Sequence, residues 1–207
     1  MENLVLIGAG GHCKSTISVL SDLSQQYKIL GILDKTNNKT LLGFPILGND
    51  DLIKTYSGNC SFLITIGSIK DTSIRERIYN EITRSNGKLA TVIAKSAVVS
   101  KYSKIGLGTV VYNLSHINAD SIIGNNCIIN SLSNIEHDCI IGDFVHISTG
   151  VMINGNCTVG ARCFLGSNSV IKNGLTICDD VIIGAGAVVL KDITEPGTYI
   201  GNPLIKI

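Results

Sequence analysis

The chain of 207 residues is long enough for one or two small domains with a buried core. Its 17 Lys and Arg against 16 Asp and Glu give a net charge of +1, which gives no sign of a nucleic-acid partner. A hydrophobic content of 44% is high for a monomer and indicates a buried apolar column together with a subunit interface. No apolar run approaches the roughly 20 residues of a transmembrane helix, and the first residues lack the basic region of a signal peptide. We therefore expect no membrane insertion and a cytoplasmic location.

Residues 1–90 alternate short apolar runs with helical segments and form the first predicted domain. In chain order these are a strand at 4–7, a helix at 16–20, strands at 29–33 and 62–66, and a helix at 71–85. In the last segment Ile74, Ile78 and Ile82 have the spacing of one buried helix face. The alternation predicts a small parallel, Rossmann-like α/β sheet.

A glycine-rich loop, residues 8–12, directly follows the first strand. Gly8 and Gly10 fit the start of a dinucleotide fingerprint, but the third glycine position holds Cys13. Such a loop exposes backbone N–H groups at a helix start, which suits a phosphate or a sugar nucleotide. Asp34 and Gly67 end two further strands at the same sheet edge, and Asp34 is placed to accept hydrogen bonds from a ribose or a base. A tight turn without a ligand is the alternative; the convergence of three strand ends favours binding.

From residue 93 onward, an aliphatic residue returns at every sixth position. Neither the strand period of two nor the helical period of 3.6 explains this spacing, and a fixed short period indicates a solenoid. The second predicted domain is therefore residues 91–207. The repeating residues are Ile93, Val99, Ile105, Val111, Ile117, Ile123, Ile129, Ile135, Ile141, Ile147, Ile153, Val159, Leu165, Ile171, Ile177, Ile183 and Val189.

Smaller residues repeat four positions after the aliphatic residues, with Leu175 as a bulky exception, and form a second inward set. Cys127, Cys139, Cys157 and Cys163 belong to this set, where cysteine acts as a compact hydrophobe. No Cys-x-x-Cys pair occurs, so we interpret them as reduced core residues and expect no metal site. Gly or Asn often follows the aliphatic residue directly, which we interpret as tolerance of tight corner geometry.

This pattern resembles the hexapeptide-repeat acyltransferases. The resemblance implies a left-handed parallel β-helix in which three hexapeptides make one triangular coil. Five to six such coils fit between residues 93 and 194.

The most specific chemistry lies in the segment from Asn130 to Asp138. His137 comes two residues after an inward isoleucine, and Asp138 beside it can orient the ring and stabilise its protonated form. With 18 residues in a coil, Gly155 is expected directly over His137, about 4.8 Å away. A glycine there leaves room for a thioester to approach a free backbone N–H, so that a base and an oxyanion donor face one carbonyl.

Two further histidines, His116 and His146, each immediately precede an inward isoleucine and therefore point outward. We interpret His116 as an exposed residue on a polar face. His146 is half a coil from His137, so the two cannot meet within one chain. They can meet across a subunit interface, which predicts an intermolecular site and a homotrimer, because a triangular prism offers three equivalent faces.

Residues 135–138 (IEHD), followed by residues 141–148 (IGDFVHIS), narrow the resemblance to one group of enzymes. They are similar to the nucleotide-sugar N-acetyltransferases of the bacillosamine and related amino-sugar pathways, and to the broader sialic-acid O-acetyltransferase family. The similarity extends to the glycine loop and to residues 201–203.

The resemblance implies a role for each candidate residue. His137 is the general base, Asp138 polarises it, and Asn130 contacts the amino sugar. His146 contacts the acetyl region and so belongs to both the substrate site and the cofactor site. Backbone at Gly155 meets the thioester, and the turn at Ala185 and Gly186 belongs to the acetyl-CoA site. Gly10, Gly11 and His12, with Asp34 and Gly67, hold the nucleotide sugar.

We therefore expect an acetyl-CoA-dependent N-acetyltransferase for a nucleotide-linked 4-amino-4,6-dideoxy sugar used in surface glycans. Transfer is direct, because the nearest cysteine, Cys139, points inward. Two alternatives stay open: an O-acetyltransferase of sialic acid or another sugar hydroxyl, and a non-catalytic β-helix binding module. The outward His137–Asp138 pair argues against the second. The sequence leaves the nucleotide open among UDP, dTDP and GDP.

Overall fold

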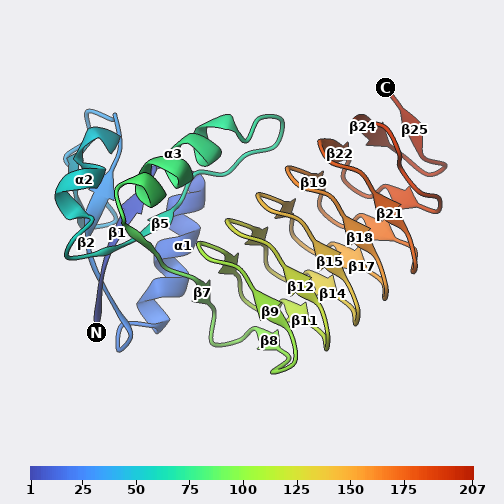
Figure 1. Ribbon diagram of the computed structural model, residues 1–207, viewed down its shortest axis with the longest axis horizontal. Helices are drawn as coiled ribbons and strands as arrows, with labels where there is room; N and C mark the ends of the chain where they lie inside the picture. The colour runs from blue at the N-terminus through green and yellow to red at the C-terminus, as the bar shows by residue number, and fades with distance from the viewer.

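The computed structural model describes residues 1–207 and contains two parts, an α/β domain and a parallel β-helix that extends away from it (Figure 1). The expected fold class is confirmed, since a mostly parallel sheet is followed by regularly stacked two-residue strands. No helix has both the length and the apolar character needed to cross a bilayer.

The N-terminal domain is built on a six-stranded sheet of order β3-β4-β2-β1-β5-β6. All its strand pairs are parallel except β3 with β4, which form a hairpin that the sequence did not reveal. The strands are β1 (Glu2–Ile7), β2 (Tyr27–Leu33), β3 (Thr40–Leu41), β4 (Phe44–Gly48), β5 (Ser61–Ile64) and β6 (Lys88–Leu89). The helices are α1 (Gly11–Asp22), α2 (Ile53–Tyr56), preceded by a 3₁₀ turn at Asp50–Leu52, and α3 (Ser73–Arg84).

The helices cover both faces of this sheet. Helix α1 packs on one face through Cys13, Ile17 and Leu20, while α2 and α3 pack on the other. The buried face of α3 differs from the predicted one: Ile78 and Ile82 are buried, but Ile74 is 52% exposed. Arg75 is buried in its place, because that side of α3 also faces the β-helix.

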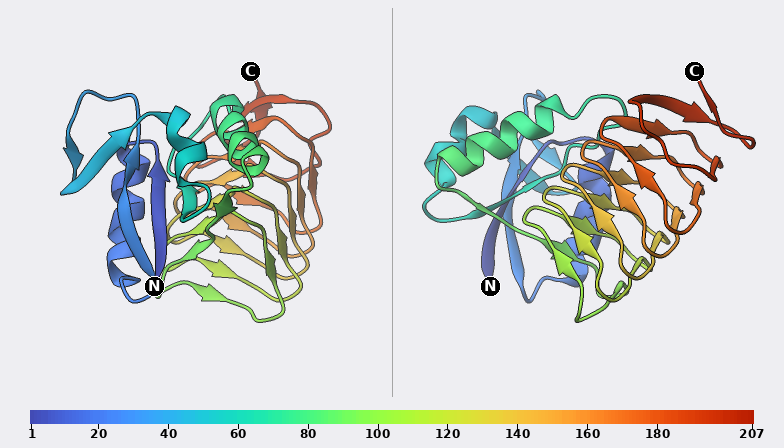
Figure 2. Two further views of the ribbon diagram at one scale, coloured as in Figure 1. Left: turned by 60° about the vertical axis from the view of Figure 1, so that its left-hand side comes forward. Right: turned by 45° about the vertical axis from the view of Figure 1, so that its right-hand side comes forward.

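The β-helix has three sheets (Figure 2). The first sheet contains β7 (Val92–Ile93), β10 (Val110–Val111), β13 (Ile128–Ile129), β16 (His146–Ile147), β19 (Phe164–Leu165), β22 (Val181–Ile183), β24 (Gly197–Ile200) and β25 (Ile205–Lys206). The second contains β8 (Val98–Val99), β11 (His116–Ile117), β14 (Asn134–Ile135), β17 (Met152–Ile153), β20 (Val170–Ile171) and β23 (Val188–Val189). The third contains β9 (Lys104–Ile105), β12 (Ile122–Ile123), β15 (Ile140–Ile141), β18 (Thr158–Val159) and β21 (Thr176–Ile177). From β7 to β20 each strand pairs in parallel with the strand 18 residues later. At the C-terminal end β22 pairs with β24 through Ile182 and Thr198, and β25 adds an antiparallel strand.

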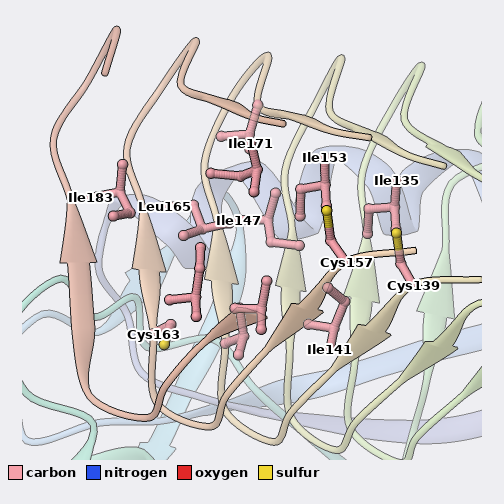
Figure 3. Packing of buried hydrophobic residues seen from close by; sticks show 14 of the residues in the cluster. Ile135, Cys139, Ile141, Ile147, Ile153, Cys157, Cys163, Leu165, Ile171 and Ile183 are labelled. Atoms are coloured by element: carbon pink, nitrogen blue, oxygen red, sulfur yellow. The ribbon is translucent and has the colours of Figure 1, made fainter. Parts of the chain in front are cut away.

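The six-residue repeat forms the interior column, as Figure 3 shows for Ile135, Ile153 and Ile171. The four inward cysteines are buried in the same column and form no disulfide. Ile93 is an exception, because it is 37% exposed. It belongs to the first coil, where no preceding coil covers the end of the column.

The glycines that directly follow the aliphatic residues have a different role from the predicted one. Their φ angles lie outside the left-handed region. A Cβ on Gly124 would lie 2.7 Å from the Asp143 nitrogen, and one on Gly142 would lie 2.6 Å from the Ala161 nitrogen. These glycines are therefore needed because successive coils approach closely. From Gly108 to Gly186 the left-handed residues occur two positions later in each turn and include Leu132, with φ of 62°.

The two parts share a core between α1 and the first sheet of the β-helix. Leu20 of α1 belongs to the same apolar cluster as Val110, Tyr112 and Ile128. This packing sets the first turn of α1 against the β-helix, and it brings His12 close to His146 of β16.

Candidate functional site

His137 and Asp138 lie at the corner between the second and third sheets, directly after β14. Asp138 has φ of 60°, a left-handed conformation that aspartate adopts more readily than most residues. Its Oδ2 atom accepts a hydrogen bond from Nδ1 of His137 at 2.7 Å. This bond raises the pKa of His137 above its ordinary value and leaves Nε2 as the free ring nitrogen. The His137 side chain is 59% exposed, so Nε2 is open to a substrate.

Gly155 lies one coil beyond His137, as the 18-residue coil predicted. A Cβ on Gly155 would lie 2.7 Å from both Cε1 and Nε2 of the His137 ring, a separation that real Cβ atoms essentially never show. The Gly155 N–H makes no hydrogen bond within the chain, although its carbonyl accepts one from Gly174. The glycine therefore makes room for the ring and leaves a free donor beside it.

A polar network supports this corner from the neighbouring strands. Glu136 accepts hydrogen bonds from Asn134 Nδ2 at 2.9 Å and from Asn118 Nδ2 at 2.8 Å, and these bonds lower the Glu136 pKa. His116 Nδ1 donates to Asn134 Oδ1 at 2.9 Å. The expectation that His116 is an exposed, unengaged residue is therefore wrong: it is half-buried and belongs to the network beside His137.

His146 points outward from the β-helix, as predicted, but the N-terminal domain of the same chain covers it. Its Nδ1 donates to the Ser68 carbonyl oxygen at 2.8 Å, and its ring meets Phe164 edge-on. Nε2 is buried without a hydrogen-bond partner. Burial, and then the positive charge of Arg75, lower the pKa of His146 to about 4, so the ring is neutral at pH 7.

His12, in the first turn of α1, lies beside His146 with ring centroids 6.4 Å apart. The Tyr112 hydroxyl joins Thr16 at 2.6 Å and His12 Nδ1 at 3.2 Å. His12 Nε2 is also buried without a partner. Burial, then the neighbouring His146 and Arg75, lower the pKa of His12 to about 3. Two neutral imidazoles therefore leave two unpaired nitrogens at the domain junction.

Two other candidate residues border this junction. A Cβ on Gly67 would lie 3.6 Å from the His12 Cβ, so the loop that follows β5 packs on the first turn of α1. Asn130 lies one coil beyond Tyr112, at the corner between the first and second sheets. Its Oδ1 accepts the Ser131 N–H at 2.9 Å, and the amide nitrogen makes no hydrogen bond within the chain.

A separate cavity of about 420 Å³ opens at the carboxyl ends of β1, β2 and β5. Gly8 and Asp34 line it, together with Ile7, Leu33, Lys35, Asp50, Ile66, Ile74, Arg77 and Ile78. The Asp34 carboxylate accepts the Ala9 N–H at 2.6 Å and the Thr36 N–H at 2.7 Å, so it also fixes the glycine loop. Gly10 and Gly11 are exposed, with open space where a Cβ would lie.

Ala185 and Gly186 form an exposed turn three coils beyond Ser131 and Leu132, on the same corner as Asn130. Gly186 has φ of 67°. The turn is therefore remote from His137, which lies on a different corner of the β-helix.

The structure thus gathers the candidate residues into separate regions. His137, Asp138 and Gly155 meet at one corner of the β-helix. His12 and His146 meet at the domain junction. His146 lies in the first sheet and His137 at the corner between the second and third sheets, so the two are apart within one chain, as their half-coil separation predicted.

Sequence reasoning missed Tyr112, although a signal was present. The equivalent position in later coils holds Asn130, Ser148, Gly166 and Gly184, so a tyrosine is unusually large there. Ser68, which holds His146 through its carbonyl, left no comparable signal.

Comparisons with known proteins agree with this architecture. Residues 3–82 match the model of the PglD N-terminal domain, and residues 120–155, 138–173 and 156–191 match that of the bacterial transferase hexapeptide. A search of curated protein sequences gives no significant match.

Solved structures of similar proteins cover the whole chain. The acetyltransferase domain of PglB from Neisseria gonorrhoeae is 30% identical, with a TM-score of 0.93 and coverage of 100% of both chains. It has also been solved with acetyl coenzyme A. PerB from Caulobacter crescentus, solved with CoA and GDP-perosamine, is 32% identical, with a TM-score of 0.91 and coverage of 100% of this chain and 98% of the other.

Proposed function

The chain belongs to the hexapeptide-repeat acetyltransferases that carry a PglD-type N-terminal domain, and we propose that it acetylates the amine of a nucleotide-linked amino sugar. The acetyl donor is acetyl-CoA, and the acceptor class is a 4-amino-4,6-dideoxy sugar for a surface glycan. The observation that carries the proposal is the His137–Asp138 pair beside the free N–H of Gly155. Complexes of the similar proteins with acetyl coenzyme A and with GDP-perosamine support both substrate classes.

In the proposed reaction the sugar amine attacks the thioester carbonyl, and a C–N bond replaces the C–S bond. His137 Nε2 accepts the amine proton and returns it to the departing CoA sulfur. Asp138 stabilises the imidazolium through Nδ1, and the Gly155 N–H donates to the oxyanion. General base catalysis of this kind contributes about 10² to 10⁴-fold, and positioning contributes much of the rest. The inward, buried Cys139 takes no part, so no acyl-enzyme forms.

The nucleotide is proposed to bind at the strand ends of the N-terminal domain. The cavity beside Gly8 and Asp34 has apolar walls for a base, and Asp34 keeps acceptor capacity beyond its two backbone bonds. The exposed backbone of Gly10 and Gly11 at the start of α1 suits the diphosphate. The sugar then extends toward the junction, where His12, Gly67 and Asn130 are proposed to contact it.

We also propose a homotrimer with each site shared between adjacent chains. His146 lies in the first sheet and His137 at the corner between the other two sheets, so a common site needs His137 from a neighbour. Ala185 and Gly186, on the same corner as Asn130, are then free to contact acetyl-CoA along the groove between two β-helices. Apolar side chains on the outer surface of the β-helix are available for such an interface: Leu114, Ile122, Leu132, Ile140 and Met152.

The proposed compartment is the cytoplasm, because all seven cysteines are free thiols.

An acetyl-transfer assay with acetyl-CoA as the donor tests the proposal. The acceptors are 4-amino-4,6-dideoxy sugars linked to UDP, dTDP or GDP, and, for comparison, the free amino sugar and sialic acid. Mass spectrometry detects the acetylated product, and NMR assigns the acetyl group to nitrogen or oxygen. We expect N-acetylation of a nucleotide-linked sugar and no reaction of the free sugars. O-acetylation of sialic acid alone would establish the rival function, which the same base could serve.

A further inference from the structure

Arg75 is a buried charge that the proposed chemistry does not use. Its side chain is 1% exposed, yet it forms no salt bridge with any carboxylate. An unpaired buried guanidinium is costly unless its hydrogen bonds are satisfied. Arg75 extends from α3 toward the β-helix, so its partners define how the two parts are joined.

All five hydrogen bonds of Arg75 go to uncharged acceptors. Nε donates to Asn126 Oδ1 at 3.1 Å, and Nη2 donates to the same atom at 2.7 Å and to the Asn126 carbonyl oxygen. Nη1 donates to the Phe144 carbonyl oxygen at 3.4 Å and to Ser68 Oγ at 3.2 Å. Because a guanidinium has five N–H donors, none is left for a ligand. Arg75 therefore acts through the residues it holds.

Ser68 connects Arg75 to the site. Its hydroxyl accepts from Arg75, and its carbonyl oxygen accepts the Nδ1–H of His146 at 2.8 Å. Two consecutive hydrogen bonds thus run from α3, through the loop after β5, to β16. The hydrogen bond from His146 to the Ser68 carbonyl keeps the proton on Nδ1, so Nε2 is left as an acceptor.

We propose that Arg75 is a positioning residue for His146: by holding Ser68 it fixes the orientation and tautomer of the His146 ring, so that Nε2 accepts a hydrogen bond from a substrate. This inference rests on the proposed role of His146 in substrate contact. Arg75 itself touches no substrate, because its donors are occupied.

The charges around His146 reinforce the same arrangement. The titratable groups that face it are His12 from α1 and Arg75 from α3, and the Tyr112 hydroxyl lies beyond His12. No carboxylate pairs with either histidine at the junction. Burial and the nearby guanidinium both disfavour an imidazolium, so the pKa of His146 is lowered. A neutral ring is required for Nε2 to accept.

A double-mutant cycle separates positioning from simple structural support. We expect Arg75→Met to lower kcat/KM about tenfold in otherwise native protein, and to have no further effect in a His146→Ala background. Arg84→Met, on the exposed last turn of α3, is the matched control and is expected to behave like wild type. Equal losses from Arg75→Met in both backgrounds would overturn the inference. A fully active His146→Ala variant would instead overturn the proposed role of His146.

Histidine ¹H–¹⁵N NMR tests the inference even if Arg75→Met does not fold. We expect wild-type His146 to be neutral and protonated on Nδ1 at pH 6.5, and Arg75→Lys, which keeps a charge but has fewer donors, to populate both tautomers. Asn126→Asp keeps the oxygen that Arg75 contacts and adds a counter-charge, so it should raise the pKa of His146 while preserving the tautomer. A wild-type His146 protonated on Nε2, or an unchanged tautomer in Arg75→Lys, would contradict the proposal.

Discussion

A single methyl group on Gly155 is expected to disable the proposed base without disturbing the fold. The Cβ of Gly155→Ala would lie 2.7 Å from Nε2 and Cε1 of His137 and 3.2 Å from Nδ1. Ordinary contacts of this kind begin near 3.4 Å, so the ring must move by about 0.7 Å or rotate away. Either movement lengthens the hydrogen bond to Asp138, which is 2.7 Å in the native chain.

The expected size of the effect follows from that displacement. A misplacement of about 1 Å at a reacting group costs about 10²-fold in rate. We therefore expect Gly155→Ala to lower kcat about 10²-fold. Stability should change little, because the φ angle of Gly155 lies outside the left-handed region and the side chain that must move is exposed.

Steady-state kinetics and urea unfolding of four variants test this expectation: Gly155→Ala, Gly58→Ala, His137→Ala and the His137→Ala/Gly155→Ala double variant. Gly58→Ala is the control, since its added Cβ meets nothing within 4 Å. His137→Ala removes the ring and with it the clash, so Gly155→Ala should add only a small loss in that background. The reasoning is refuted if Gly155→Ala keeps near-native kcat, or if it loses the same factor with and without the His137 ring.

Three further outcomes follow. Asp138→Asn removes the carboxylate that raises the pKa of His137, so the acid limb of the kcat/KM profile should move to lower pH; an unmoved limb contradicts this. Asp34→Ala should raise KM for the sugar nucleotide and leave that for acetyl-CoA unchanged; equal changes would mean that the loop is a structural turn. His12 and His146 have folded pKa values of about 3 and about 4, below the unfolded value near 6.5. The unfolded state therefore binds more protons, and the free energy of unfolding should fall as pH drops from 6.5 to 4. Each histidine contributes about 1.4 kcal/mol per pH unit to the slope of the unfolding free energy against pH. His146→Gln should therefore reduce the total slope by that amount.

The features predicted best from the sequence are the positions of residues within the six-residue repeat. A strict period of six fixes which residues face inward, and 18 residues per coil places Gly155 over His137 without knowledge of any other contact. The strand–helix alternation likewise predicted the parallel sheet. The hairpin of β3 and β4 was missed, because β3 has only two residues and Pro45 lies within the short apolar run of β4.

The surroundings of His146 could not be predicted, since they depend on how the N-terminal domain packs against the β-helix. Helical spacing assigned Ile74 to the buried face, but the second surface of α3 buries Arg75 instead. The spacing of apolar residues predicts the one helix face that packs on the sheet of its own domain. It does not predict a second face that is buried when the domain packs against the β-helix. For the same reason Ser68, which acts through its backbone carbonyl, had no sequence signature.

Mixed oligomers of two strongly impaired variants give the most direct test of a site shared between chains. His137→Ala and His146→Ala subunits are co-expressed with different tags, and trimers that carry both tags are isolated. In each mixed trimer one interface regains both histidines, one loses both, and one lacks a single histidine. We expect the isolated mixed trimers to recover about one third of wild-type activity, because one interface in three regains both histidines. Mixed trimers no more active than either parent would contradict the account.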